Sequence, residues 1–203
     1  MLISEMTFSI CSRADITNFI EKNHYSGSIN GCMATYCFKL EHDGRVIGAA
    51  FFGRMAMANQ YKRFASVESD VIELRRLCCI DDTPRNTESF FIGRMLRWLQ
   101  LNTEIKTVVS YADAEYGHSG TIYKASNFKY LGKRPGAKVI MWNGKKYHDK
   151  AIRTKYKGEL KPFAVRLKMA LVTGDATYIM TAGKHTFVYD LGNRKVRHDQ
   201  RAK

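Results

Sequence analysis

The organisation of this chain is decided by residues 71–132, which read VIELRRLCCIDDTPRNTESFFIGRMLRWLQLNTEIKTVVSYADAEYGHSGTIYKASNFKYLG. Residues 71–80 form an apolar, strand-like run, and a polar turn and an amphipathic helix follow it. Residues 106–113 repeat the strand pattern and lead through a glycine-containing turn into a second, short helix. This order predicts a βαβα unit, in which ligands bind outside the carboxyl ends of the strands. Acids, hydroxyls and a histidine gather at these ends, so the sequence predicts a reaction site there.

The turn after the second predicted strand holds more polar groups than a helix cap needs. Its four polar residues are Asp113, Glu115, His118 and Ser119. We expect Ser119 to cap the following helix and the glycines at 117 and 120 to let the backbone approach a ligand closely. Tyr123, four residues after Ser119, lies on the same helical face and is either a general acid or a core aromatic. These groups are suited to bind substrate, donor or metal.

A second polar loop follows the first predicted helix. Ser12 and Asp15 have the spacing of a capping box, and apolar residues at helical intervals continue the helix to about residue 22. His24, Tyr25 and Ser26 come directly after it. A histidine beside a phenol and a hydroxyl is suited to act as a general base or as a metal ligand. The alternative is a histidine that only interacts with the end of the helix.

The first strand of the βαβα unit carries charges inside an apolar run. Glu73 and Arg75 are two residues apart and therefore face the same side of the strand. They form either a structural ion pair or a site in which Glu73 holds Arg75 against an anionic donor or a phosphate. The turn after the strand completes the predicted donor site with Arg85, Asn86 and Thr87. Asn86 or Thr87 is expected to cap the next helix, whose N-terminus attracts anions.

The remaining predicted elements are mostly strands. Asp43-Gly44 between the apolar runs 34–40 and 45–52 predicts a β-hairpin. Beyond Gly132 the pattern is strand-like at residues 138–142, 178–181 and 185–190. The predicted order is αββ, then βαβα, then a basic β-rich end. We expect a single domain over residues 1–203, with about 133–203 as a basic C-terminal extension packed on it or contiguous with it.

Composition favours a globular protein that works in a reducing compartment. The hydrophobic content of 45% supports a core, and no run approaches the roughly 20 apolar residues of a membrane span. The first residues do not have the pattern of a secretory signal. Five cysteines, an odd number without CxxC spacing, are expected to be reduced thiols and not a structural zinc site. These features predict a cytoplasmic protein.

The charge distribution indicates a nucleic-acid partner. The net charge is +14, and residues 129–168 contain 13 Lys or Arg but only two acids. Aromatic residues lie among these charges, as is typical of surfaces that combine phosphate contacts with base stacking. The alternative is a solvated surface that aids solubility. The residues predicted to contact double-stranded DNA are Lys133, Arg134, Lys145, Lys146, Lys150, Arg153 and Lys155.

Several motifs together resemble one family. They are Asn23-His24-Tyr25-Ser26, Glu73-Leu74-Arg75-Arg76-Leu77, residues 84–89, Ser110-Tyr111-Ala112-Asp113, and residues 117–128 with Tyr130 and Gly132. They resemble the phage Mom proteins, over about residues 24–193 and most strongly over 73–132. The resemblance implies an α+β fold like that of the Gcn5-related N-acyltransferases, with a mixed central sheet flanked by helices and a basic β-rich C-terminal part.

The resemblance also implies an activity. It is the addition of a carbamoylmethyl or related acyl group to the exocyclic N6 amine of adenine in DNA, which protects viral DNA from host restriction. The turn at residues 82–87 departs from the glycine-rich pyrophosphate loop of acyl-CoA enzymes. The donor is therefore left open between acetyl-CoA and an activated glycine species. Iron is a further possible cofactor, with His24, Asp113 and His118 as its candidate ligands.

Two other functions compete with this expectation. One is a non-catalytic DNA-binding or antirestriction protein, which would have no use for the polar cluster between Asp113 and Tyr123. The other is a conventional acyl-CoA N-acetyltransferase, against which the missing glycine loop and the basic C-terminal part weigh. The sequence leaves the oligomeric state open between monomer and dimer.

Overall fold

The computed structural model describes residues 1–29 and 31–192, and these divide by their contacts into two compact units. Of the described residues, the sheet unit comprises 1–112 (without 30), 118–132 and 185–192. The inserted unit comprises residues 113–117 and 133–184. It is an insertion because the strand that follows it, β12, returns to the sheet of the first unit. Residues 193–203 of the predicted C-terminal extension lie outside the described residues.

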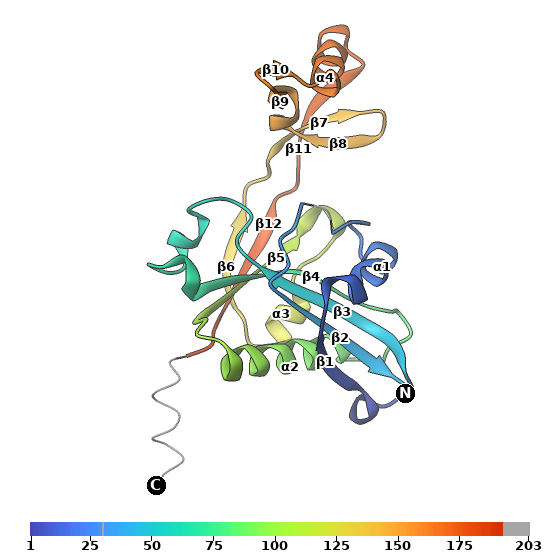
Figure 1. Cartoon of the computed structure of the whole chain (residues 1–203), viewed down its shortest axis with the longest axis vertical. Helices are drawn as coiled ribbons and strands as arrows, with labels where there is room; N and C mark the ends of the chain where they lie inside the picture. Colours follow the sequence, from blue (N-terminus) through green and yellow to red (C-terminus); the bar gives the residue numbers. More distant parts are fainter. Residues whose placement is uncertain (30, 193–203) are drawn as a thin grey trace. The chain divides into compact units, whose positions relative to one another are not determined.

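The described part of the sheet unit contains a seven-stranded mixed sheet (Figure 1). Strands β1 to β4 pair as antiparallel neighbours, and β5 then runs parallel to β4. In sheet order the strands are β1 (Thr7–Cys11), β2 (Tyr36–His42), β3 (Arg45–Gly53), β4 (Val71–Cys79), β5 (Thr107–Asp113), β12 (Lys184–Asp190) and β6 (Lys129–Arg134). The parallel pair β4–β5 is connected through a helix, as the βαβα prediction requires.

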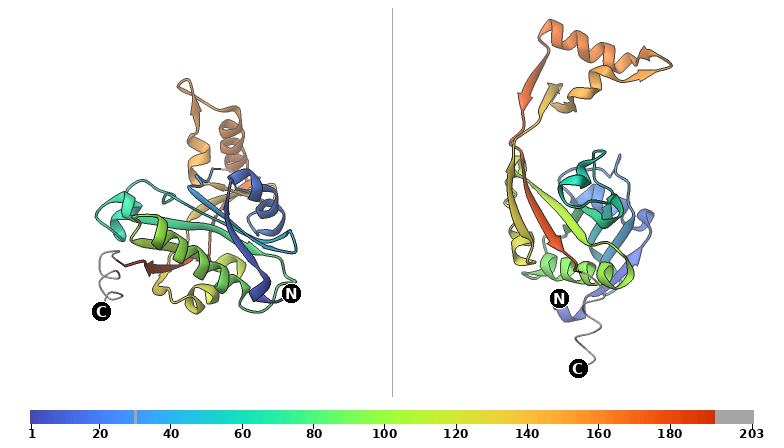
Figure 2. Two further views of the ribbon diagram at one scale, coloured as in Figure 1. Left: turned by 60° about the horizontal axis from the view of Figure 1, so that its bottom comes forward. Right: turned by 90° about the vertical axis from the view of Figure 1, so that its left-hand side faces the viewer.

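Helices cover both faces of this sheet (Figures 1 and 2). Helix α2 (Thr87–Asn102) buries Phe91, Met95 and Leu99 against one face, together with α3 (Thr121–Ala125). Helix α1 (Arg13–Asn23) buries Ile16 and Ile20 against the opposite face. The two cores use alternate residues of β2 and β3, because successive side chains of a strand point to opposite faces. Short 3-10 turns lie at Ile3–Glu5, Gln60–Arg63, Glu68–Asp70 and Ala114–Tyr116.

The inserted unit has a small core of its own. Strands β11 (Ala176–Met180), β7 (Lys138–Trp142) and β8 (Lys145–His148) form a three-stranded antiparallel sheet. Helix α4 (Pro162–Thr173) contributes Leu167 and Ala170 to the core beside Ile140. A 3-10 turn at Asp149–Arg153 and the short pair β9 (Lys155–Tyr156) and β10 (Glu159–Leu160) complete it.

The local predictions are confirmed where a capping or turn motif governs them. Ser12 caps α1 in a capping box with Asp15, and Asp43-Gly44 forms the tight turn between β2 and β3, with both residues at positive φ. Two predictions are wrong. A strand, β1, precedes α1, so the order of helices and strands starts βαββ. The cap residue of α3 is Gly120 at φ +75° in place of Ser119. Strand β6 and helix α4 are not among the elements predicted from the sequence. None of the described helices is long and apolar enough to span a membrane.

Candidate functional site

The two central strands separate at the middle of the sheet. β4 and β5 pair from Val71 with Thr107 as far as Leu74 with Ser110, although β4 continues to Cys79. A β-bulge shifts the register of β3 against β4 between Phe51 and Phe52, close to this point. Bulges bend and twist a strand locally, so the bulge helps to turn β4 away from β5. Backbone groups of β4 beyond Leu74 are thereby freed from pairing with β5.

A buried hydroxyl pair lies where the strands separate. The Ser110 hydroxyl donates to the Leu74 carbonyl at 3.3 Å. The buried Tyr123 packs between Phe128 and Phe187, with ring centroids 5.5 and 5.2 Å away. Burial raises the pKa of Tyr123, partly offset by a hydrogen bond to Ser110. Tyr123 is therefore both a core aromatic and a phenol that keeps its proton at neutral pH. Ser110 also belongs to the site, although no role is predicted for it from the sequence.

Glu73 and Arg75 form the predicted ion pair. Arg75 Nη1 lies 3.6 Å from Glu73 Oε2 and donates to the Arg54 carbonyl at 3.0 Å, while Nη2 donates to Cys32 Sγ at 3.5 Å. Glu73 is only 8% exposed and also accepts from the Ala56 N–H. The structural alternative is therefore confirmed for this pair. Contact of Arg75 with a donor stays a prediction.

The loop after α1 fixes the orientation of His24. The Ser26 N–H donates to His24 Nδ1 at 3.1 Å, and the Ser26 hydroxyl lies 2.9 Å from the same nitrogen. A backbone N–H only donates, so Nδ1 is an acceptor and the neutral ring carries its proton on Nε2. His24 is thus arranged to donate a hydrogen bond through Nε2. Because Nε2 already carries the proton, His24 is not suited to act as a general base through this nitrogen.

The structure brings the two predicted polar loops together around Tyr25. Its ring centroid lies 4.2 Å from that of His24 and 5.0 Å from that of His118. Tyr25 is 44% exposed, and His118 is exposed too. Ser119 lies next to His118 and shares a hydrogen bond with Thr121. The four residues His24, Tyr25, Ser26 and His118, which we call the histidine cluster, form a polar and aromatic surface open to a substrate.

The environment of His24 lowers its pKa from 6.5 to about 4. Burial is the main cause, and the positive charge of Arg76 and the neighbouring His118 add to it. Arg76, like Ser110, is a residue of this region for which the sequence predicts no role. His24 is consequently neutral at physiological pH.

This pKa shift predicts how stability changes with acidity. Between pH 6.5 and about 4 the unfolded chain protonates His24 and the folded chain does not. The contribution of His24 is therefore fully present above pH 6.5 and is lost as the pH falls toward 4. We expect the melting temperature of His24→Gln to fall less than that of the wild type over this range, in melts from pH 7 to 4. If the melting temperatures of the two proteins fell in parallel between pH 7 and 4, the lowered pKa of His24 would be contradicted.

The glycines of the second loop serve different needs. Gly117 and Gly120 both have φ near +75°, but a Cβ on Gly117 would meet nothing within 4 Å, whereas one on Gly120 would lie 2.2 Å from the Phe187 ring. Gly120 thus makes room for the core. We expect Gly117→Ala to cost about 1 kcal/mol of backbone strain and Gly120→Ala about 2–4 kcal/mol, because overpacking adds to the strain. Urea unfolding of both variants measures the difference, and equal losses would contradict it.

The turn before α2 is closed by its own hydroxyls. Thr83 and Thr87 donate to the Ile80 and Pro84 carbonyls at 3.1 and 2.7 Å. Asn86 is the N-cap residue but lies at φ +72°, and its side chain makes no capping hydrogen bond. Arg85 is exposed beside it. Three of the predicted donor residues, Arg85, Asn86 and Thr87, therefore lie at the N-terminus of a 16-residue helix, a position that favours anions, whereas Glu73 and Arg75 lie within β4.

The inserted unit engages Asp113 in contacts of its own. Asp113 caps the turn by accepting from the Glu115 N–H at 3.1 Å, and its other oxygen lies 3.1 Å from Lys184 Nζ. Two predicted DNA contacts are also paired, Lys146 with Glu115 and Arg153 with Asp149. The capping alternative for Asp113 is confirmed, and its catalytic role stays a prediction.

The structure does not support the iron site that is one of the expectations from the sequence. Among the described residues no group of three or more His, Cys, Asp or Glu side chains could hold a metal. The candidate ligands are engaged elsewhere, since His24 Nδ1 accepts from Ser26 and Asp113 pairs with Lys184. These residues do not form a metal-binding set.

Comparison with known proteins identifies relatives at two levels. A model of the Mom protein family matches residues 5–202. Methylcarbamoylase mom of Escherichia phage Mu is 32% identical over 108 residues, which cover 51% of this chain and 44% of the relative, less than half its length.

Solved structures share the fold at low sequence identity. An N-acetyltransferase from Staphylococcus aureus Mu50 superposes with a TM-score of 0.52 at 16% identity, over 92% of this chain and 99% of that one. Arabidopsis thaliana NAA60 in complex with acetyl-CoA gives 0.53 at 12%, over 91% and 98%. A GNAT-family acetyltransferase from Streptococcus pneumoniae gives 0.52 at 8%, over 93% and 100%. The predicted acyltransferase-like fold is confirmed.

Proposed function

Because the chain belongs to the Mom protein family, we propose that it is a DNA-modification transferase that alters the N6 amine of adenine with a carbamoylmethyl or related acyl group. The name of the phage Mu relative, a methylcarbamoylase, supports the group transferred. The acyltransferase-like fold supports a transfer reaction. The observation that carries the proposal is the histidine cluster, because it joins two loops through residues that a DNA-binding protein does not need. Protection of viral DNA from restriction would follow from the modified base.

The proposed substrate makes two demands on the enzyme. The amine of adenine is a poor nucleophile because its lone pair is delocalised into the ring, so it must lose a proton as it attacks. It is also stacked and paired inside the duplex, so the base must be flipped out at a cost of a few kcal/mol. The exposed ring of Tyr25 is suited to stack on the extruded base.

The contacts of the cluster divide the proposed roles between its two histidines. His118 is exposed next to Tyr25 and would accept the proton of the amine. His24 is neutral with its proton on Nε2, so it would donate a hydrogen bond to the substrate or to developing negative charge. Tyr123, which keeps its proton at neutral pH, would protonate the leaving group.

The donor would lie where β4 and β5 separate, with its anionic part at the N-terminus of α2. An activated donor supplies the electrophilic carbon, and acetyl-CoA bound to NAA60 is one such group in this fold. A carbamoylmethyl group together with the N6 nitrogen that carries it has the atoms of a glycinamide unit, so simple acetyl transfer does not account for it. An activated glycine species therefore remains the alternative donor. Arg85 and the first turn of α2 would hold either anion.

The inserted unit would bind the DNA. Residues 133–184 hold 13 Lys or Arg against three acids. We expect duplex binding to weaken steeply with salt, because each phosphate contact releases a counterion and contributes roughly 0.9 to the slope of log affinity against log salt. Replacing Lys145, Lys150 and Lys155 with Gln should reduce this slope by about 2–3.

Fluorescence anisotropy with a labelled duplex measures the slope. The matched control replaces three exposed cations of the sheet unit with Gln: Lys22, Arg45 and Arg94. The control should keep the wild-type slope. Binding that does not depend on salt, or an equal loss in both triple variants, would contradict the role of the inserted unit. Nucleoside analysis of DNA from expressing cells tests the reaction itself.

A further inference from the structure

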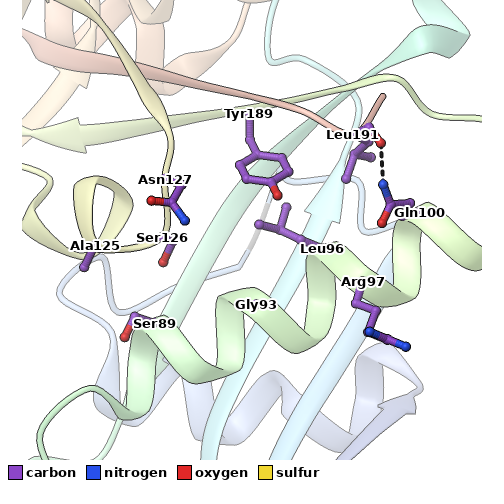
Figure 3. A pocket seen from close by; sticks show the side chains of 10 residues that line it. All are labelled: Ser89, Gly93, Leu96, Arg97, Gln100, Ala125, Ser126, Asn127, Tyr189 and Leu191. Atoms are coloured by element: carbon purple, nitrogen blue, oxygen red, sulfur yellow. Dashed lines mark hydrogen bonds between the residues drawn. The ribbon is translucent and has the colours of Figure 1, made fainter. Parts of the chain in front are cut away.

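A cavity of about 370 Å³ lies in the sheet unit, between α2, the turn after α3 and the end of β12 (Figure 3). This volume is within the range of small-molecule sites in proteins. Its lining includes none of the residues predicted above for catalysis, donor binding or DNA contact. The cavity is therefore a candidate for a separate ligand.

A glycine keeps the cavity open. Gly93 is in the interior of α2, where glycine destabilises a helix relative to alanine. Its φ is not positive, and a Cβ at this position would meet nothing within 4 Å. Neither backbone conformation nor close packing therefore explains the glycine. Gly93 lines the cavity, so the missing side chain leaves space for a bound molecule.

Three polar side chains of the lining are already bonded to the protein. Gln100 donates to the Leu191 carbonyl at 2.6 Å, Ser126 to Ile122 at 2.8 Å, and Ser89 to Asn86 at 3.0 Å. These bonds fix the walls and leave fewer groups for a ligand.

Other polar side chains of the lining are unused. Within residues 1–29 and 31–192, the Asn127 carboxamide and the Arg97 guanidinium have no hydrogen-bond or ion-pair partner. Tyr189 adds a half-buried ring that packs on Phe128 at 5.2 Å. No acidic residue lines the cavity. The walls thus combine an amide, an aromatic ring and one positive charge.

We propose that this cavity binds a purine mononucleotide. The Asn127 carboxamide pairs a donor with an acceptor and so matches the N6 and N7 edge of adenine. The Tyr189 ring offers an aromatic surface to the base, and Gly93 and Ala125 leave room for a flat ring. Arg97 lines the cavity from α2, and its long flexible side chain, which points away from Asn127 and Tyr189 in Figure 3, turns to pair with the phosphate.

Titration calorimetry with AMP tests the proposal. The wild type should bind AMP with a dissociation constant below about 1 mM. It should bind inorganic phosphate much more weakly. Arg97→Ala should weaken AMP binding about tenfold or more, because it removes a charge-assisted contact. Arg94→Ala, on the same helix but outside the lining, should bind within twofold of the wild type.

Two substitutions at Gly93 distinguish an effect on the stability of α2 from an effect on the space in the cavity. Gly93→Ala should raise the melting temperature by about 2–4 °C through helix propensity. Gly93→Leu should fill the cavity and abolish AMP binding with α2 intact, as judged by its melt. Wild-type affinity in Gly93→Leu, phosphate binding as tight as AMP binding, or no AMP binding near 1 mM would overturn the proposal. Arg97→Ala decides the question if the leucine variant does not fold.

Discussion

Arg75→Ala should lower the free energy of unfolding by about 3–5 kcal/mol, or the melting temperature by roughly 10 °C in a chain of this length. The change removes the partner of Glu73, which is 8% exposed. It also removes the donors that tie the Arg54 carbonyl and the Cys32 thiol to β4. Removing one charge of a buried ion pair costs much more than the loss of a surface ion pair.

Two further variants isolate the cause of this loss. Arg45→Ala removes an exposed arginine of the sheet unit and should leave the melt within about 2 °C of the wild type. Glu73→Gln combined with Arg75→Met should recover part of the loss, because no unpaired charge is then buried. An Arg75→Ala protein that melts like the wild type but does not modify DNA would contradict the structural role and favour contact with the donor.

His118→Ala should reduce DNA modification by about 10²- to 10⁴-fold, the usual contribution of a general base. Duplex affinity should stay within about twofold, since the proposed phosphate contacts lie in the inserted unit. His148→Ala, which removes an exposed histidine of the inserted unit, should modify DNA at the wild-type rate. Timed nucleoside digests measure the rates, and wild-type modification by His118→Ala would exclude it as the base.

His24 should respond differently from His118. Its ring is arranged as a hydrogen-bond donor, and a glutamine amide also donates. His24→Gln should therefore retain more activity than His24→Ala. His118→Gln should be as inactive as His118→Ala, because an amide does not accept a proton near neutral pH. Equal losses in both His24 variants would contradict a donor role for His24.

The sequence predicts best what neighbouring residues decide. The capping box of Ser12 and Asp15 and the turn at Asp43-Gly44 are set by local hydrogen bonds and backbone preferences, and both are confirmed. The spacing of Glu73 and Arg75 predicts that they share a side of β4, and they form an ion pair there. Helix α4 also carries local signals that would have identified it, Pro162 at its start and Gly174 at its end.

Contacts between distant segments are beyond such reasoning. The approach of Tyr25 to His118 depends on how two loops meet in the folded sheet unit. Gly120 leaves space for Phe187, a residue of β12, and only the folded chain brings the two together. In the sequence alone, Gly120 therefore has the pattern of a ligand-binding turn. The position of β12 in the sheet, beside β5, likewise follows from tertiary packing and not from its own pattern.

The central claim is the reaction on adenine, and one mass spectrum tests it most directly. Plasmid DNA from bacteria that express the wild-type chain is digested to nucleosides and compared with DNA from cells that express His118→Ala. We predict a deoxyadenosine that carries the added mass of one carbamoylmethyl group, or of a related acyl group, in the wild-type sample only. Unmodified deoxyadenosine from cells that contain folded wild-type protein would contradict the account and favour a non-catalytic DNA-binding protein.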